Sequence, residues 1–181
     1  MRDIVFITGN ENKIKEAREL LGINVGHEKI DLDEIQSLDP KVVISHKLDQ
    51  AYDLLKKPVF VEDVSLELSA LNGFPGPLIK FFLNSLGRQK ICDIVHSLHD
   101  TKVVAKATIG YKDDKSVRFF EGSVLGDIAK SPLGDSGFGW DPIFIRKGES
   151  KSFAQMSLED KNKNSHRSVA FEKFKNWLDS E

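Results

Sequence analysis

The 181-residue sequence predicts an α/β protein built on a mixed β-sheet flanked by helices. Two observations lead to this fold class. In the N-terminal half, short apolar runs typical of buried strands alternate with segments whose apolar residues recur at helical spacing. In the middle of the chain, a polar turn separates two alternating segments, as in a β-hairpin. Parallel units followed by a hairpin predict a mixed sheet, and we expect two lobes around a cleft.

The N-terminal elements are a strand and a helix. Residues 3–8 form an apolar run that predicts a buried first strand. Residues 11–21 predict a helix, which Gly22 ends. The apolar face of this helix consists of Ile14, Ala17 and Leu21. The stretch Lys29–Leu32 predicts a short second strand.

The next two elements are a longer helix and another strand. Asp39 is a good capping residue and Pro40 suits the first helical position, so a helix begins here. Its apolar residues are Ile44, Leu48, Ala51 and Leu55. Pro58 ends the helical pattern, and the apolar residues 59–61 predict a buried strand.

The C-terminal half contains helices at both ends of a hairpin region. Apolar residues between 79 and 98 predict two helices, and 103–111 and 116–125 alternate like strands around the polar turn 112–115. A glycine-rich loop follows at 134–142. The chain ends in a helix whose inward residues are Ala170, Phe174, Trp177 and Leu178.

Charge and composition exclude several classes of protein. With 26 Lys+Arg against 28 Asp+Glu, the net charge of -2 excludes the dominant basic surface of duplex-binding proteins. The apolar runs stay far below the ~20 residues that a membrane span needs. Cys92 is the single cysteine, which excludes an internal disulfide and argues against a cysteine-built zinc site. The first residues lack a secretory pattern, so we expect a soluble, cytoplasmic protein that binds neither nucleic acid nor membrane.

The segment Thr8–Lys13 predicts an anion site. It lies at the end of a strand and the start of a helix, where backbone N–H groups and the helix dipole favour negative charge. Gly9 permits a tight turn, and Lys13 adds a point charge for phosphate. The alternative is an ordinary strand–helix turn with a solvated lysine.

Two acidic residues follow the second predicted buried strand. Glu62 and Asp63 come directly after apolar residues 59–61, where ligands bind in α/β sheets, and their carboxylates suit Mg²⁺. Alternation along the strand points the two side chains to opposite faces. A helix cap or a surface pair is the alternative. The acidic run Asp31–Glu34 belongs to this site only if it folds beside Asp63.

Two late segments carry further candidate groups. Residues 136–142 place Phe138 and Trp140 in a permissive loop before Asp141, where aromatic rings can stack on a base. Residues 161–167 collect cationic and polar donors before the last helix. A tight turn with core aromatics and a basic solvated loop are the alternatives.

Taken together and in order, these motifs are specific. They are TGNENK at 8–13, VEDVSLELSALNGFPGPLIKFFL at 61–83, FGWDP at 138–142 and KNKNSHR at 161–167. The sequence resembles, over residues 1–181 as a single domain, the inosine triphosphate pyrophosphatase family of Ham1-like non-canonical purine NTP pyrophosphatases. It departs from the bacterial pattern at Val64-Ser65 and at Leu78-Ile79-Lys80.

The resemblance implies an elongated sheet with two lobes around a central nucleotide cleft, a homodimer, and dependence on Mg²⁺, with Mn²⁺ as a substitute. The implied reaction hydrolyses ITP, dITP or XTP to the monophosphate and pyrophosphate, which clears deaminated purines from the nucleotide pool.

The resemblance also implies roles for individual residues. Lys13 and Asp63 would be catalytic, with Asp63 as proton acceptor, and Glu34 and Asp63 would bind the metal. The triphosphate would contact Thr8, Gly9, Asn10, Glu11, Asn12, Lys13 and Lys47. The base pocket would be lined by Phe138, Gly139, Trp140 and Asp141. Lys161, His166 and Arg167 would contact the base and its 6-oxo oxygen, with Ser165 nearby.

Two other functions are compatible with parts of the pattern. A Maf-like nucleotide pyrophosphatase shares the α/β organisation, but we expect its opening motif to be rich in Ser and Thr with paired arginines, which TGNENK lacks. A non-catalytic nucleotide- or RNA-binding module could use Phe138 and Trp140. The net charge of -2 and the Glu62-Asp63 pair favour metal-assisted hydrolysis instead.

Overall fold

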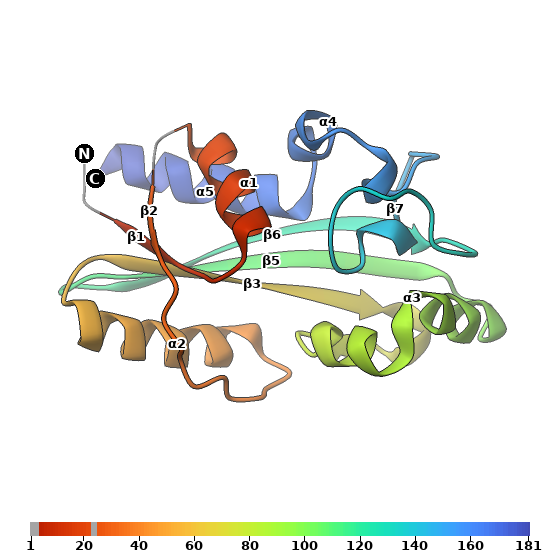
Figure 1. The fold of residues 1–181 in the computed structure, drawn as a ribbon, viewed down its shortest axis with the longest axis horizontal. Coiled ribbons are helices and arrows are strands. Elements are labelled where there is room, and N and C mark those ends of the chain that lie inside the picture. The colour runs from red at the N-terminus through yellow and green to blue at the C-terminus, as the bar shows by residue number, and fades with distance from the viewer. Residues whose placement is uncertain (1–3, 23–24) are drawn as a thin grey trace. The chain divides into compact units, whose positions relative to one another are not determined.

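The computed structural model describes residues 4–22 and 25–181, and Figure 1 shows their fold. The strands are β1 (Val5–Ile7), β2 (Gly26–Glu28), β3 (Val59–Leu68), β4 (Pro75–Gly76), β5 (Lys102–Lys112), β6 (Val117–Ile128) and β7 (Phe144–Arg146). The helices are α1 (Glu11–Leu21), α2 (Pro40–Leu55), α3 (Ile79–Ser97), α4 (Leu158–Lys163) and α5 (His166–Ser180). Short 3₁₀ turns occupy Ser69–Leu71, Asp141–Ile143 and Phe153–Gln155.

The seven strands form one mixed sheet in the order β2-β1-β3-β5-β6-β7, with β4 paired to β3. Strand β1 pairs in parallel with both β2 and β3, whereas β3 pairs antiparallel with β4 and β6 pairs antiparallel with β7. The predicted α/β class with a mixed sheet and flanking helices is therefore confirmed. None of the helices in 4–22 and 25–181 is long and apolar enough to cross a membrane.

The chain divides into two compact units. Unit 1 comprises Met1–Asp63, Ala107–Gly122 and Arg167–Glu181, and unit 2 comprises Val64–Lys106 and Ser123–His166. Strands β3, β5 and β6 therefore contribute residues to both units. The elongated shape and the cleft between two lobes stay predictions.

In unit 1, helices cover both faces of the strands (Figure 1). Helix α2 packs Ile44 and Leu48 against Val59 and Val61 on one face. On the other face Phe60 stacks on Phe6, with ring centroids 4.4 Å apart, and meets the aromatic rings Phe171 and Phe174 of α5. The alternation along β3 thus continues at its polar residues: Glu62 shares a face with Phe60, and Asp63 shares a face with Val61.

In unit 2, α3 covers a second apolar core. Its residues Ile79, Ile91 and Val95 pack with strand residues and with the aromatic side chains Trp140, Phe144 and Phe153. Gly87 interrupts α3 with φ of 73°, a conformation that side chains with a Cβ disfavour. The interruption yields the two helical segments that the sequence predicts between 79 and 98.

Two sequence expectations about strands differ from the structure. The strand predicted at Lys29–Leu32 is wrong: the short parallel strand is β2, and Ile30 and Leu32 pack from a loop onto the core beside α2. Apolar residues that alternate in a loop give the same sequence pattern as a half-buried strand, which explains the wrong prediction. Strand β3 continues to Leu68, well past the expected 59–61, because Leu66 and Leu68 are buried after the polar interruption.

The remaining boundaries agree closely with the sequence. Strand β1 lies within the expected 3–8, of which Asp3 is outside the described residues. Helix α1 begins after its cap Asn10 and ends at Gly22, and α2 begins after its cap Asp39. The short helix α4 was not predicted, and it converts the first part of the expected loop 161–167 into helix.

Candidate functional site

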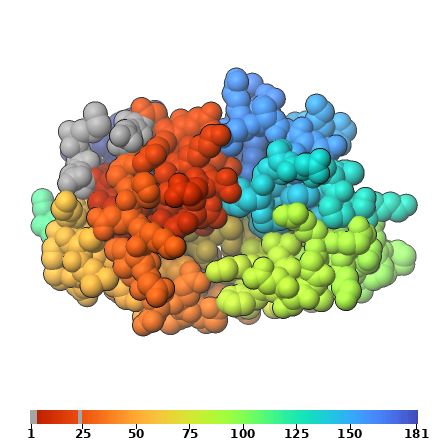
Figure 2. All heavy atoms as spheres, viewed as in Figure 1, coloured from red at the N-terminus to blue at the C-terminus, as the bar shows by residue number. Residues whose placement is uncertain are grey.

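The TGNENK segment forms the turn between β1 and α1. The Asn10 side chain accepts hydrogen bonds from the backbone N–H groups of Asn12 and Lys13, and the Thr8 hydroxyl accepts one from Asn10. Gly9, Glu11 and Asn12 are exposed, and the start of α1 reaches the molecular surface in Figure 2. Because Asn10 already engages two of the first N–H groups of the helix, a phosphate at this turn would have to displace its side chain or bind beside it.

Lys13 points from this turn toward β3. Its ammonium donates to the backbone carbonyl of Glu62 at 3.0 Å and lies 3.4 Å from the Glu62 carboxylate. The lysine side chain is 14% exposed. The Lys13 side chain, which the sequence predicts to bind phosphate, is therefore largely buried, and its ammonium lies beside the Glu62 carboxylate.

Arg167, one of the predicted base-contacting residues, is 1% exposed. Its Nε donates to Glu62 Oε1 at 2.7 Å, and its Nη1 is ion-paired with Glu16. Burial alone would lower the pKa of the guanidinium, but the two carboxylates raise it above its ordinary value. Arg167 therefore carries a permanent charge at the start of α5, matched by acidic residues of β3 and α1.

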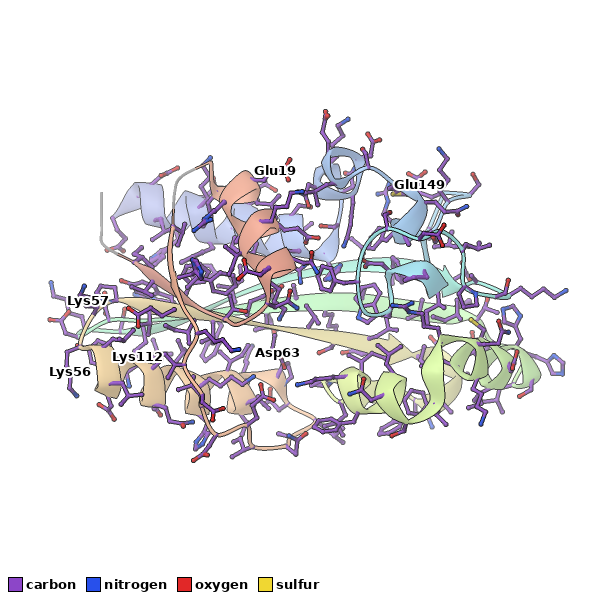
Figure 3. The ribbon with its side chains drawn as sticks, viewed as in Figure 1. Glu19, Lys56, Lys57, Asp63, Lys112 and Glu149 are labelled. Carbon is purple, nitrogen blue, oxygen red and sulfur yellow. The ribbon has the colours of Figure 1, made fainter. Side chains whose placement is uncertain are left out.

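Asp63 lies on β3 (Figure 3), on the strand face opposite to Glu62. The other predicted metal ligand, Glu34, is half-exposed, and its carboxylate accepts a hydrogen bond of 2.8 Å from Lys47 of α2. A Mg²⁺ ion commonly takes one or two carboxylates and completes its shell with water and substrate phosphates. Glu34 and Asp63 fit that donor set, and among the described residues there is no group of three or more His, Cys, Asp or Glu that could hold a metal ion by itself.

The FGWDP loop in unit 2 is organised around Asp141. The carboxylate of Asp141 accepts hydrogen bonds from the Phe138 backbone N–H at 2.9 Å and from Lys161 at 2.8 Å. Gly137 has a φ of +75°, and a Cβ added there would lie 2.5 Å from Asp141 Oδ2. Position 137 thus requires glycine, and the hydrogen bonds to the buried Asp141 carboxylate fix the conformation of the loop.

Aromatic rings surround the donors of the KNKNSHR segment. The Lys161 ammonium lies 4.9 Å from the centre of the Phe138 ring and 5.6 Å from that of Phe153. Trp140 packs against the imidazole of His166, with centroids 5.0 Å apart. This aromatic and cationic arrangement suits the flat face and polar edge of a purine.

The predicted residues therefore gather in two groups. Unit 1 contains 8–13, Glu34, Lys47, Asp63 and Arg167, and unit 2 contains 138–141, Lys161, Ser165 and His166. Ser165 directly precedes α5, at the position of a capping residue.

Sequence reasoning missed two contributors. Glu16 is 3% exposed and pairs with Arg167, although it stands outside the apolar positions of its helix. One indication in the sequence that Glu16 faces inward is that it lies three residues after Lys13 and next to Ala17, which belongs to the apolar face of the helix. Arg88 donates to the Gly139 carbonyl at 2.7 Å, and nothing in its sequence surroundings indicates that contact.

Comparison with known proteins agrees with the motifs. The family model described as Ham1 family matches residues 4–177. The chain belongs to the Ham1 family. A Ham1-family relative from Yarrowia lipolytica, named inosine triphosphate pyrophosphatase, is 40% identical over 97% of this chain and 95% of its own. The dITP/XTP pyrophosphatase of Saccharolobus solfataricus is 37% identical over 98% of this chain and 94% of its own.

Solved Ham1 structures have the same fold. The HAM1 protein of Coxiella burnetii matches with a TM-score of 0.87 at 25% identity, covering 100% of both chains. The Ham1 protein of Staphylococcus aureus matches with a TM-score of 0.76 at 27% identity, covering 98% of both chains.

Proposed function

We propose that this chain is a nucleoside triphosphate pyrophosphatase that hydrolyses ITP, dITP and XTP to the monophosphate and pyrophosphate. The observation that carries the proposal is similarity over nearly the full length to proteins named dITP/XTP pyrophosphatase and inosine triphosphate pyrophosphatase. The positions of Lys13, Lys47, Asp63 and the FGWDP loop support it, because each supplies a group that the reaction needs.

The phosphate chain would be bound by cations of unit 1. Lys13 and Lys47 place two ammonium groups on α1 and α2, beside Glu62 and Glu34 respectively. An ammonium has three N–H donors, so each lysine could contact a phosphate while it keeps its carboxylate partner. Such fixed positive charges stabilise the negative charge that develops on the phosphate oxygens as the bond between the α and β phosphorus atoms breaks.

Asp63 would accept the proton of the attacking water. Its carboxylate lies on the strand face opposite to the Glu62–Arg167 pair, so it is not part of that buried pairing. Glu34 and Asp63 would also hold a Mg²⁺ ion, for which Mn²⁺ could substitute. When bound, the ion supplies Lewis-acid neutralisation of phosphate charge.

Selection of the base would rest on donors around the FGWDP loop and on Arg167. Hypoxanthine and xanthine carry an oxygen at position 6, whereas adenine carries an amino group there. Donors such as His166, Lys161 or Arg167 would pair with the oxygen and oppose the amino group. A mispaired buried donor costs about 1–3 kcal/mol, or roughly 5–150-fold per contact.

The test is a nucleotide panel. The purified protein is incubated with Mg²⁺ and, separately, ITP, XTP, GTP and ATP, and the products are identified by chromatography. We expect pyrophosphate with IMP or XMP, and little product from GTP or ATP. Release of single phosphate from every nucleotide, or no turnover at all, would contradict the proposal.

Further properties belong to the same proposal. The chain would act as one functional domain over residues 1–181, as a cytoplasmic homodimer. Exposed Phe74 and Phe81, near the start of α3, support a partner surface. Light scattering coupled to size-exclusion chromatography should give twice the 20.4 kDa chain mass. A monomer at micromolar concentration would contradict the dimer.

A further inference from the structure

Glu62 contacts residues from two separate substrate motifs. Its side chain has no exposed surface, and its carboxylate lies 2.7 Å from Arg167 Nε and 3.4 Å from Lys13 Nζ. Its backbone carbonyl accepts a further hydrogen bond from Lys13 at 3.0 Å. Lys13 belongs to the TGNENK turn and Arg167 to the KNKNSHR segment, so one buried residue of β3 lies between them.

The four charged side chains of this network, Lys13, Glu16, Glu62 and Arg167, all belong to unit 1. Glu62 and Glu16 supply two negative charges, and Lys13 and Arg167 supply two positive charges. A buried charge that loses its partner is costly, so each member constrains where the next can lie. The Glu62 carboxylate lies 2.7 Å from one cation, Arg167, and 3.4 Å from the other, Lys13.

Glu62 and the proposed proton acceptor, Asp63, lie on opposite faces of β3. Asp63 follows it and points to the opposite face of β3, toward the α2 side. The Glu62 side chain therefore points away from the strand face that carries the proposed proton acceptor. Its contacts include Lys13 and Arg167, the groups proposed to bind substrate.

We propose that Glu62 is a positioning residue that holds Lys13 and Arg167 in their productive places, which deepens and rests on the proposed pyrophosphatase function. The carboxylate orients the ammonium for the phosphate chain and anchors the guanidinium that reads the base. Misplacement of a reacting or binding group by about 1 Å costs on the order of 100-fold in rate.

The charge of Glu62 gives the proposal a distinctive kinetic signature. Glu62→Gln keeps the side-chain shape but removes a negative charge 3.4 Å from the Lys13 ammonium. The positive potential at Lys13 then rises, which favours binding of anions, while Lys13 and Arg167 lose their anchor. We expect kcat for ITP to fall about 10–100-fold, with KM unchanged or lower.

Two further measurements test the contact of Glu62 with Lys13 and its contact with Arg167 separately. Tripolyphosphate, a phosphate chain without a base, should bind Glu62→Gln at least as tightly as wild type by calorimetry. The ratio of kcat/KM for ITP to that for ATP should fall at least about fivefold, because Arg167 has lost one anchoring carboxylate. Glu62→Asp keeps the charge and should recover kcat at least about threefold over Glu62→Gln.

The matched control is Glu67→Gln. It removes a carboxylate from the same strand, where Glu67 pairs with Lys106 at 2.7 Å outside this network. Its kinetics should stay within about twofold of wild type. If Glu62→Gln does not fold, Glu62→Asp decides: kcat lowered at least about threefold with KM unchanged supports the proposal, and wild-type kcat overturns it.

A rise in KM together with weaker tripolyphosphate binding, or an unchanged ITP-to-ATP ratio, would overturn the proposal. Wild-type protein is assayed alongside. If wild type does not cleave ITP, the proposed function fails, and tripolyphosphate binding still tests the role of Glu62: tighter or equal binding by Glu62→Gln supports it, and weaker binding overturns it.

Discussion

Replacing Asp141 by asparagine tests how the FGWDP loop is held. The Asp141 and Lys161 side chains are each 4% exposed, and their charged atoms lie 2.8 Å apart. Breaking a buried ion pair costs about 3–5 kcal/mol, because the remaining charge stays buried. For a chain of this size each kcal/mol corresponds to about 2–4 °C, so we expect Asp141→Asn to lower Tm by about 6–20 °C.

A double-mutant cycle measures the pairing itself. Lys161→Met removes the ammonium while preserving most of the volume, and alone it should cost about as much as Asp141→Asn. The double variant leaves neither charge behind, so its cost should fall short of the sum by at least about 2 kcal/mol. Urea unfolding and scanning calorimetry measure these free energies.

The exposed pair between Lys163 and Asp160 provides the comparison. Their side chains are 57% and 61% exposed at 3.0 Å, so Lys163→Met should change the free energy of unfolding by less than about 1 kcal/mol. The reasoning is refuted if Asp141→Asn costs no more than this exposed variant, or if the two buried substitutions are additive.

Three other predictions follow from the same geometry. Gly137→Ala forces a Cβ to within 2.5 Å of Asp141 Oδ2 at a φ of +75°; it should lower Tm and weaken ITP binding, and a wild-type Tm would show that the loop tolerates alanine. Asp63→Asn should reduce kcat by about 100-fold or more, and retained turnover in a steady-state assay would remove Asp63 from the chemistry. Burial raises the pKa of the Cys92 thiol to about 11, so iodoacetamide at pH 8 should alkylate native protein at least about 100-fold more slowly than urea-unfolded protein; equal rates would contradict the burial.

Local sequence rules predict the elements that begin and end with strong caps. Asn10 and Gly22 bound α1, and Asp39 with Pro40 starts α2, as the cap preferences require. The TGNENK motif lies at the start of α1, as its sequence predicts. These features depend on neighbours in sequence, which is why sequence alone is sufficient. Glu62 and Asp63 were expected at the end of a strand, but they lie inside β3 because that strand continues to Leu68.

The buried charge network depends on distant partners and could not be predicted in the same way. Arg167 pairs with Glu62 across 105 residues and with Glu16 across 151. Alternation placed Glu62 and Asp63 on opposite faces, but it does not say which faces a cation. The strand assigned to Lys29–Leu32 failed for a related reason, since Ile30 and Leu32 are apolar for packing from a loop.

The interior position of Arg167 also changes how its role is understood. The sequence assigns it to the base, as a basic residue in a polar segment. In the structure Arg167 is 1% exposed, and its guanidinium is paired with two carboxylates. If Arg167 recognises the base, that recognition would therefore depend on Glu16 and Glu62, which fix the position of the guanidinium, as much as on Arg167 itself.

The most direct test of the proposed reaction is to identify which phosphate bond is cleaved. The protein is incubated with ITP and Mg²⁺ in ¹⁸O-labelled water, and the products are analysed by mass spectrometry. Water attack at the α phosphorus predicts IMP carrying one ¹⁸O and unlabelled pyrophosphate. Formation of IDP with labelled phosphate would contradict the account.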